Sequence, residues 1–139
     1  MHTKDLGTWG EQLVLAQIIK HGFGCYSPVG ENTRTDLILE RENGILIKVQ
    51  VKTLNRSSLD PEMSPFNRVS SRPSYKYTYT SSDIDWFAVV DVQTEKIAWL
   101  SIGLLEGNET KGFNLRHSPS KNNQRKGTHW FDDYTEFPF

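Results

Sequence analysis

Two neighbouring apolar segments joined by a short turn constrain the fold of this 139-residue chain more than any other feature. Residues 35–39 read Thr-Asp-Leu-Ile-Leu, and residues 45–52 read Ile-Leu-Ile-Lys-Val-Gln-Val-Lys. Both segments have the composition and alternation of β-strands. Because side chains alternate along a strand, Gln50 and Lys52 point to the same side, roughly 6–7 Å apart. The pair of segments predicts a hairpin that carries polar groups at one end.

The link between the two segments allows two registers. A two-residue turn at positions 43 and 44 places Asp36 opposite Val51, on the wrong face for Gln50. A three-residue loop with Gly44 in the left-handed conformation pairs Arg41 with residue 45 and places Asp36 opposite Gln50. We predict the second register. The alternative is an ordinary hairpin with scattered polar groups on its surface.

A second carboxylate comes from the first predicted helix, which spans residues 4–21. Glu11 shares one face of this helix with the apolar residues at positions 14, 15 and 18. A carboxylate in an apolar stripe is unfavourable unless it is paired or bound to a metal. The alternative is a capping box, Thr8-x-x-Glu11, at the start of a helix. A helix that begins before Thr8 argues against that alternative.

The combination resembles a known family. Gly10-Glu11 on a helix, Gly22, Pro28, Arg34-Thr35-Asp36 and Gln50-Val51-Lys52 together resemble the PD-(D/E)xK nuclease superfamily. The similarity is greatest to its small homing endonucleases encoded in a transfer-RNA intron, and it covers about two thirds of the chain. Thr35 stands in place of the Pro of the motif, at a position that supplies no ligand. Gln50 stands in place of the usual acidic residue, as in that homing-endonuclease branch.

The resemblance implies an α/β fold with a restriction-endonuclease-like core, in which helices flank a central mixed β-sheet that carries long polar loops. It implies that Glu11, Asp36 and Gln50 are catalytic and bind Mg²⁺, with the Val51 carbonyl as a further ligand. Mn²⁺ would substitute, and Ca²⁺ would support binding without cleavage. Lys52 would orient or activate the attacking water and stabilise the charge of the phosphorane, roles that suit a lowered pKa.

Length and composition are consistent with one domain. We expect a single nuclease domain over residues 1–139, with its core over about 3–105 and a polar tail over 106–139. The single cysteine, Cys25, excludes an intramolecular disulfide and fits a reducing compartment. The longest apolar run, 86–90, is too short for a membrane span, and the N-terminus has no signal-peptide core. We expect a bacterial cytoplasmic protein associated with the nucleoid.

The net charge of −1 hides a clustered distribution of basic side chains. Residues 54–81 hold four basic and two acidic side chains, and residues 111–126 hold five basic and no acidic ones. Clustered bases suit phosphate contact, although a solvated mixed surface is the alternative. The candidate DNA-binding residues are Arg34, Arg56, Arg68, Arg72, Lys76, Lys111, Arg116, Lys121, Arg125 and Lys126.

The rest of the chain divides into loops and a second hairpin. Residues 55–73 predict a long loop, and the tyrosines at 75, 77 and 79 either face DNA or pack in the core. Residues 82–85 predict a cap or short turn before a buried strand at 86–92 and its partner at 97–100. Residues 108–128 have no apolar face, whereas Trp130, Phe131, Phe137 and Phe139 are expected to anchor the C-terminus by packing, within the chain or between subunits.

Three functions are compatible with these residues. The first is a site-specific double-strand homing endonuclease, and the second is a structure-selective nuclease such as a Holliday junction resolvase. The third, a catalytically silent DNA-binding module, is disfavoured because Glu11, Asp36, Gln50 and Lys52 are all present. An HNH nuclease built on His117 and His129 lacks the supporting pattern. One site per chain nicks one strand, so we expect a homodimer or a dimer of dimers on double-stranded DNA.

Overall fold

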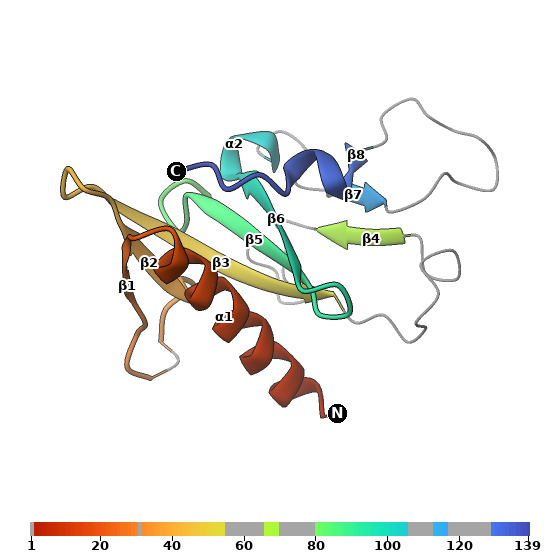
Figure 1. Cartoon of the computed structure of the whole chain (residues 1–139), viewed down its shortest axis with the longest axis horizontal. Coiled ribbons are helices and arrows are strands. Elements are labelled where there is room, and N and C mark those ends of the chain that lie inside the picture. The colour runs from red at the N-terminus through yellow and green to blue at the C-terminus, as the bar shows by residue number, and fades with distance from the viewer. Residues whose placement is uncertain (1, 31, 55–65, 70–79, 106–112, 117–128) are drawn as a thin grey trace.

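A computed structural model of the chain describes residues 2–30, 32–54, 66–69, 80–105, 113–116 and 129–139. Its centre is a five-stranded sheet with the order β1-β2-β3-β5-β6 (Figure 1). The strands are β1 (Gly24–Tyr26), β2 (Leu37–Glu40), β3 (Leu46–Leu54), β5 (Trp86–Asp91) and β6 (Lys96–Ser101). The sheet is mixed, because β3 and β5 are parallel whereas the other neighbours are antiparallel.

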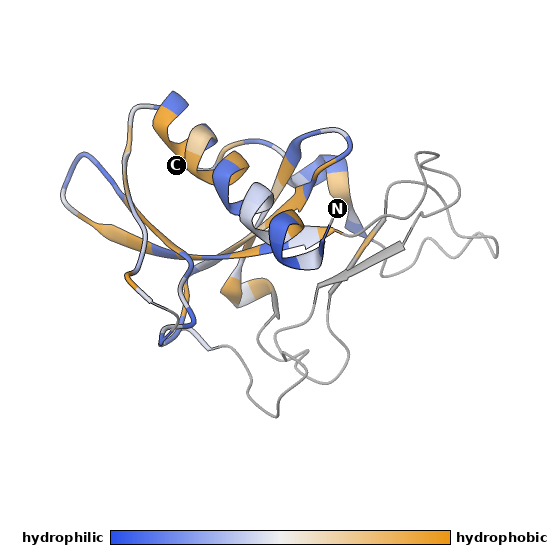
Figure 2. Ribbon diagram, turned by 90° about the horizontal axis from the view of Figure 1, so that it is seen from below, coloured by the Kyte–Doolittle hydropathy of each residue, from blue (hydrophilic) through white to orange (hydrophobic). Residues whose placement is uncertain are grey.

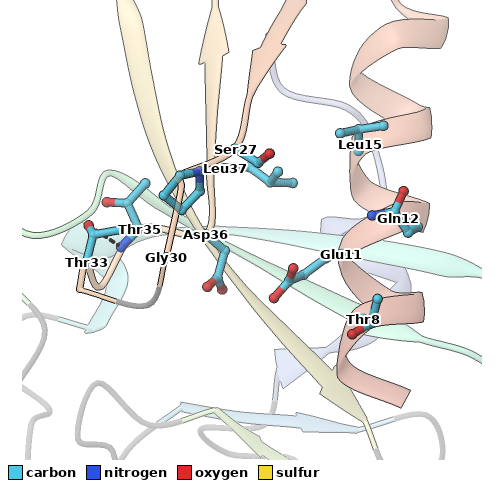
Figure 3. Close-up of a pocket in the computed structure, with 11 residues that line it drawn as sticks. Thr8, Glu11, Gln12, Leu15, Ser27, Gly30, Thr33, Thr35, Asp36 and Leu37 are labelled. Atoms are coloured by element: carbon cyan, nitrogen blue, oxygen red, sulfur yellow. Dashed lines mark hydrogen bonds between the residues drawn. The ribbon is translucent and has the colours of Figure 1, made fainter. Parts of the chain in front are cut away.

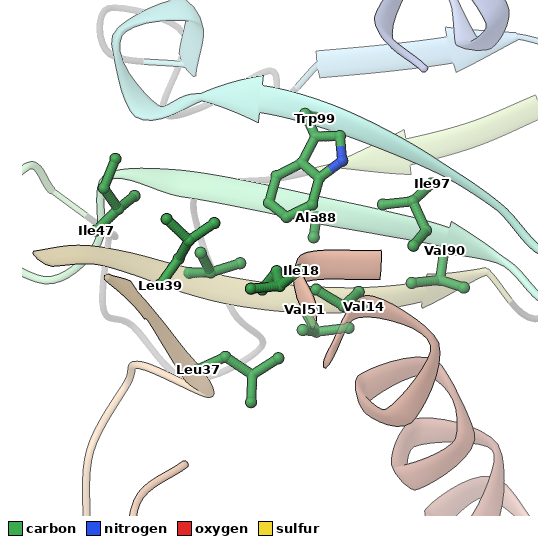
Figure 4. Close-up of a cluster of buried hydrophobic side chains, with 11 residues drawn as sticks. Val14, Ile18, Leu37, Leu39, Ile47, Val51, Ala88, Val90, Ile97 and Trp99 are labelled. Carbon is green, nitrogen blue, oxygen red and sulfur yellow. The ribbon is translucent and has the colours of Figure 1, made fainter. Parts of the chain in front are cut away.

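Helix α1 (Thr3–Lys20) covers one face of the sheet (Figure 1). Its buried side consists of Gly10, Val14 and Ile18, and the last two pack against β2, β3, β5 and β6 (Figure 4). Figure 2 shows that α1 carries both hydrophilic and hydrophobic residues. This mixture is expected for a helix that packs one side against a core. Burial of two aliphatic side chains contributes roughly 3–6 kcal/mol to this contact.

The opposite face of the sheet is covered by a different set of elements. A second sheet of order β4-β7-β8 is formed by β4 (Phe66–Val69), β7 (Phe113–Arg116) and β8 (His129–Trp130). Leu115 of β7 and Phe131 of the 3₁₀ helix η1 (Phe131–Tyr134) are fully buried there with Phe87 and Leu100. Helix α2 (Ile102–Leu105) follows β6 directly.

Two expectations about the loops and the tail are wrong. Residues 66–69 form a strand inside the segment expected to be a long loop, and residues 113–116 form a strand inside the segment expected to lack an apolar face. Leu115 is the described side chain of this strand and is buried, and a strand of four residues is too short for a periodic pattern to reveal. The core therefore extends beyond residue 105 into the expected tail.

The C-terminal anchor and the second hairpin are confirmed. Phe137 stacks on His21 with a ring-centroid distance of 3.9 Å, and Phe139 meets the edge of Trp99 at 5.6 Å. These aromatic contacts lie within one chain. Strands β5 and β6 form the expected hairpin, and residues 80–85 form the expected turn before β5. The tyrosines at 75, 77 and 79 lie outside the described residues.

Candidate active site

The register of the β2–β3 hairpin decides whether the candidate groups meet, and the predicted three-residue loop is confirmed. Leu37 pairs with Val49 and Glu40 pairs with Leu46, so the same register continues to Asp36 and Gln50. The Gly44 N–H donates to the Arg41 carbonyl at 2.8 Å, and Gly44 has a φ of 81°. That φ lies in the left-handed region, which glycine occupies without a steric penalty.

Asp36 lies at the beginning of β2 and is tied to β3 by its main chain and its side chain. Its N–H donates to the Val49 carbonyl at 2.9 Å, and its Oδ2 accepts the Val51 N–H at 2.8 Å. Burial raises the pKa of Asp36 above its ordinary value, against the lowering effects of the Val51 hydrogen bond and the Lys52 charge. The carboxylate is therefore held in place in a site that disfavours its ionised form.

Glu11 approaches Asp36 from helix α1. The two carboxylates point toward each other across a pocket of about 530 Å³ (Figure 3). Burial raises the pKa of Glu11, and the charge of Asp36 raises it further. Within the described residues, the Glu11 carboxylate accepts no hydrogen bond and joins no ion pair. The other polar side chains that line the pocket are those of Thr8, Gln12, Ser27, Thr33 and Thr35.

Glu11 is a mid-helix residue, so the capping-box alternative is wrong. The helix begins at Thr3, with His2 as its N-cap, and the Thr8 hydroxyl donates to the Lys4 carbonyl at 3.0 Å. A Thr inside a helix makes this bond to the preceding turn and does not act as a cap. The position of Glu11 on the buried side of α1 thus has no capping explanation.

Gly10 brings α1 close enough to the sheet to place Glu11 there. A Cβ atom at position 10 would collide with the Thr53 hydroxyl of β3 and would lie 3.2 Å from the Thr53 Cβ. Gly inside a helix is destabilising by about 1 kcal/mol relative to Ala, so a packing reason is expected. The close contact between α1 and β3 supplies that reason.

Gln50 and Lys52 lie on the face of β3 opposite to Val49 and Val51, which pack under α1. Burial lowers the pKa of Lys52, against the raising effect of the Asp36 charge. Gln50 Nε2 donates to the Val51 carbonyl over a long 3.4 Å. Asp36, at the beginning of β2, is therefore the group that interacts with Glu11 on the helix side and with Lys52 on the other side.

The donor set fits a hard divalent cation. Among the described residues no group of three or more His, Cys, Asp or Glu side chains is placed to hold a metal ion. A cation between Glu11 and Asp36 would need further oxygen ligands, and the Gln50 amide and Val51 carbonyl are of the type that Mg²⁺ prefers. The Gln50 amide now directs its nitrogen at the Val51 carbonyl. For the Gln50 oxygen and the Val51 carbonyl to bind the same cation, the amide group must rotate so that its oxygen takes the place of the nitrogen.

Three of the ten candidate DNA-binding residues, Arg34, Arg68 and Arg116, lie in the part of the chain that the structure describes. Arg34 is engaged within the chain, because its Nη1 lies 3.1 Å from Asp83 Oδ2. The main chain of Arg68 pairs with Asn114, and that of Arg116 pairs with Phe66, so β4 and β7 join the two basic segments. The remaining candidates, Arg56, Arg72, Lys76, Lys111, Lys121, Arg125 and Lys126, lie outside the described residues.

The sequence analysis missed the polar groups that support the site from the turn at residues 80–85. Asp83 bonds to Arg34 and Thr35, whereas Lys48 of β3 bonds to Ser82 and Asp85. The two acidic residues of that turn were visible, but nothing in their spacing pointed to β2 or β3. The role of Gly10 was also missed, although a glycine inside a strong helical pattern was a signal for a close contact.

Comparison with known proteins agrees with this fold. The sequence profile of the PD-(D/E)XK endonucleases matches residues 1–137. The chain therefore belongs to the PD-(D/E)XK endonuclease family, and it is a nuclease whose family implies a DNA substrate. Members of this family generally use divalent metal ions.

Among solved structures the chain is similar to a bacterial homing endonuclease, I-Ssp6803I, with a TM-score of 0.70. The two share 21% sequence identity, over 97% of this chain and 87% of the other. No curated protein sequence matches the chain significantly. In the described part of the chain, no helix is both long and apolar enough to cross a membrane.

Proposed function

We propose that this nuclease is a site-specific, divalent-metal-dependent double-strand DNA endonuclease of the intron-homing type. The observation that carries the proposal is the position of Asp36, which interacts with Glu11 on one side and Lys52 on the other. The structural similarity to I-Ssp6803I over 97% of the chain supports the homing role.

In this proposal Glu11, Asp36, Gln50 and the Val51 carbonyl hold Mg²⁺, and Mn²⁺ can replace it. When bound, the ion supplies Lewis acidity to a phosphate oxygen and lowers the pKa of a water ligand. The two carboxylates repel each other across the pocket, and a cation between them relieves that repulsion. Gln50 brings no charge, which forfeits several kcal/mol of attraction at an effective dielectric of about 20. We therefore expect weak metal affinity until DNA phosphates complete the coordination.

Lys52 is the general acid–base candidate. Its pKa is lowered by burial, so it exchanges a proton more readily near neutral pH than an exposed lysine does. Lys52 takes the proton of the attacking water while the water oxygen bonds to phosphorus. The bond from phosphorus to the departing sugar oxygen breaks, and that oxygen takes up a proton from solvent. The ammonium group also stabilises the negative charge of the phosphorane.

DNA binding in this proposal uses the two basic segments that β4 and β7 join. One chain has a radius of gyration near 14 Å, about one turn of duplex, and holds one candidate site. A double-strand cut thus needs at least two subunits, arranged symmetrically on a pseudo-palindromic target. Binding should weaken with salt at a slope near −0.9 per phosphate neutralised.

Plasmid cleavage tests the proposal. A plasmid that carries the intron-insertion site of the host gene is incubated with the protein and Mg²⁺, Ca²⁺ or a chelator. We expect linear product with Mg²⁺, binding without cleavage with Ca²⁺, and no cleavage with the chelator. Lys52→Ala should lose cleavage by about 10²–10⁴-fold while it still binds DNA. Lys20→Ala, at the exposed last turn of α1, is the matched control and should cleave normally.

Two results would count against the proposal. Unchanged cleavage by Lys52→Ala would reject the assignment of Lys52. Preferential cleavage of a four-way junction over the linear insertion site would favour a structure-selective nuclease such as a Holliday junction resolvase.

A further inference from the structure

Thr35, the residue that takes the place of the motif proline, makes a bond that proline cannot make. The residue is 7% exposed, and its hydroxyl donates to the main-chain carbonyl of Asp83 at 3.0 Å. The neighbouring Arg34 donates from Nη1 to Asp83 Oδ2 at 3.1 Å. The two residues immediately before Asp36 are thus bonded to one residue that lies almost 50 positions further along the chain.

Asp83 is itself firmly placed. Its Oδ2 accepts the Thr80 N–H at 3.0 Å, and its own N–H donates to the Thr80 carbonyl at 2.9 Å. The turn is anchored to β3, because Lys48 Nζ donates to the Ser82 carbonyl at 2.7 Å. The main chain of Asp85 then continues into β5, next to β3. The turn therefore forms a fixed support beside the start of β2.

This support separates Asp36 from an exposed stretch of chain. Residues 27–30, 32 and 33 are exposed, and Val29 is completely so. Going along the chain from there, Arg34 and Thr35 provide the first bonds to another element before Asp36 itself reaches β3. The hydrogen bond from the Thr35 hydroxyl to Asp83 thus holds the chain in place between the exposed stretch and Asp36.

We propose that the hydrogen bond from Thr35 to the Asp83 carbonyl positions the Asp36 carboxylate for DNA cleavage, which makes Thr35 a positioning residue. The inference rests on the proposed function, since it concerns the same site. A displacement of about 1 Å at a reacting group can lower a rate by about a hundredfold. Loss of one supporting bond is expected to give a smaller effect, because Asp36 keeps its own bonds to β3.

The test compares Thr35→Val with Thr35→Ser. Valine has nearly the shape of threonine without the hydroxyl, whereas serine keeps the hydroxyl and lacks the methyl group. For Thr35→Val we expect kcat to fall by about tenfold, with KM for DNA within about twofold of the wild type. Thr35→Ser should retain the wild-type kcat. Thr94→Val is the matched control, because it removes a threonine hydroxyl bonded to Asp91 in the distant β5–β6 turn.

A second measurement follows the carboxylate without DNA or metal. The Val51 N–H donates to Asp36 Oδ2, so its hydrogen exchange reports whether that carboxylate stays in place. In Thr35→Val the Val51 amide should exchange at least about fivefold faster, whereas the Val89 amide at the centre of the sheet should not change. Val89 also distinguishes a local effect from a general loss of folding.

The outcomes separate this inference from the proposed function. Unchanged kcat and unchanged Val51 exchange in Thr35→Val would overturn the positioning role. An equal defect in Thr35→Ser would also overturn it, since packing of the methyl group would then explain the loss. If the wild-type chain cleaves no DNA, the proposed function fails. Faster Val51 exchange in Thr35→Val alone would still support the positioning contact.

Discussion

Two aspartates near the start of β2 have pKa values that are shifted in opposite directions. Asp36 is partly buried beside a second carboxylate, and its pKa is raised mainly by that burial. Asp83 is also partly exposed, in a turn, and its pKa is lowered by the Thr80 N–H first and by Arg34 further. The polar contacts of Asp83 thus favour its charge, whereas the surroundings of Asp36 oppose it. In the proposed function Asp83 supports the fold, whereas Asp36 binds the cation.

The sharpest test of this comparison removes each charge in turn. Asp36→Asn should lower cleavage by about a thousandfold, equal to roughly 4 kcal/mol of barrier, because it removes a proposed metal ligand. Asp83→Asn should lower cleavage by less than about tenfold, since a partly exposed ion pair contributes about 0–1 kcal/mol and the main-chain acceptor of Thr35 remains. Single-turnover cleavage rates measure both. Equal losses would contradict the distinction between the two aspartates.

A second test moves Glu11 away from Asp36 and leaves Asp83 untouched. Gly10→Ala should push α1 off β3, because the new methyl group meets the Thr53 side chain. We expect a loss of about 1–3 kcal/mol in the free energy of unfolding from overpacking, and cleavage lowered by up to about a hundredfold. Chemical denaturation and cleavage assays give the two values.

The control for that test is a compensating change. Adding Thr53→Ala removes the hydroxyl and the methyl group that the new side chain meets, although the Thr53 Cβ remains 3.2 Å away. The double variant should recover part of the stability and the cleavage rate. No recovery would mean that the helix does not move in response to this contact.

The smallest expected effect concerns thermal stability, which should depend on pH with opposite signs for Asp36 and Asp83. Ionisation of Asp36 is less favourable in the folded chain, so wild-type stability falls as the pH rises from the ordinary value of 3.8 through the raised pKa. Asp36→Asn should therefore have a higher Tm than the wild type at neutral pH. The two Tm values should converge at low pH, where Asp36 is protonated.

Asp83 should give the opposite sign. Its lowered pKa adds stability that is fully present above 3.8 and is lost as the pH falls through the lowered pKa. Asp83→Asn should thus have a slightly lower Tm than the wild type at neutral pH, with convergence again at low pH. Thermal unfolding of both variants between acidic and neutral pH checks these signs. Shifts in the same direction for both variants would refute the contrast.

The features that the sequence predicted best are local. The turn at Gly44 and the alternation of residues 46–52 determine the hairpin register, because both depend on neighbours within a few positions. The helix bounds were predicted within one residue for the same reason. Strand β7 was missed, because its one described buried side chain, Leu115, faces a core built from distant segments.

The candidate site combines both kinds of information. By itself, the sequence determined that Asp36, Gln50 and Lys52 share one end of a hairpin, since strand periodicity and turn chemistry act over short distances. Only the tertiary structure decided that Glu11 meets Asp36 from the helix side and that Asp83 supports Thr35. Those contacts join residues far apart in the chain, and they depend on how closely α1 and the turn at residues 80–85 pack against the sheet.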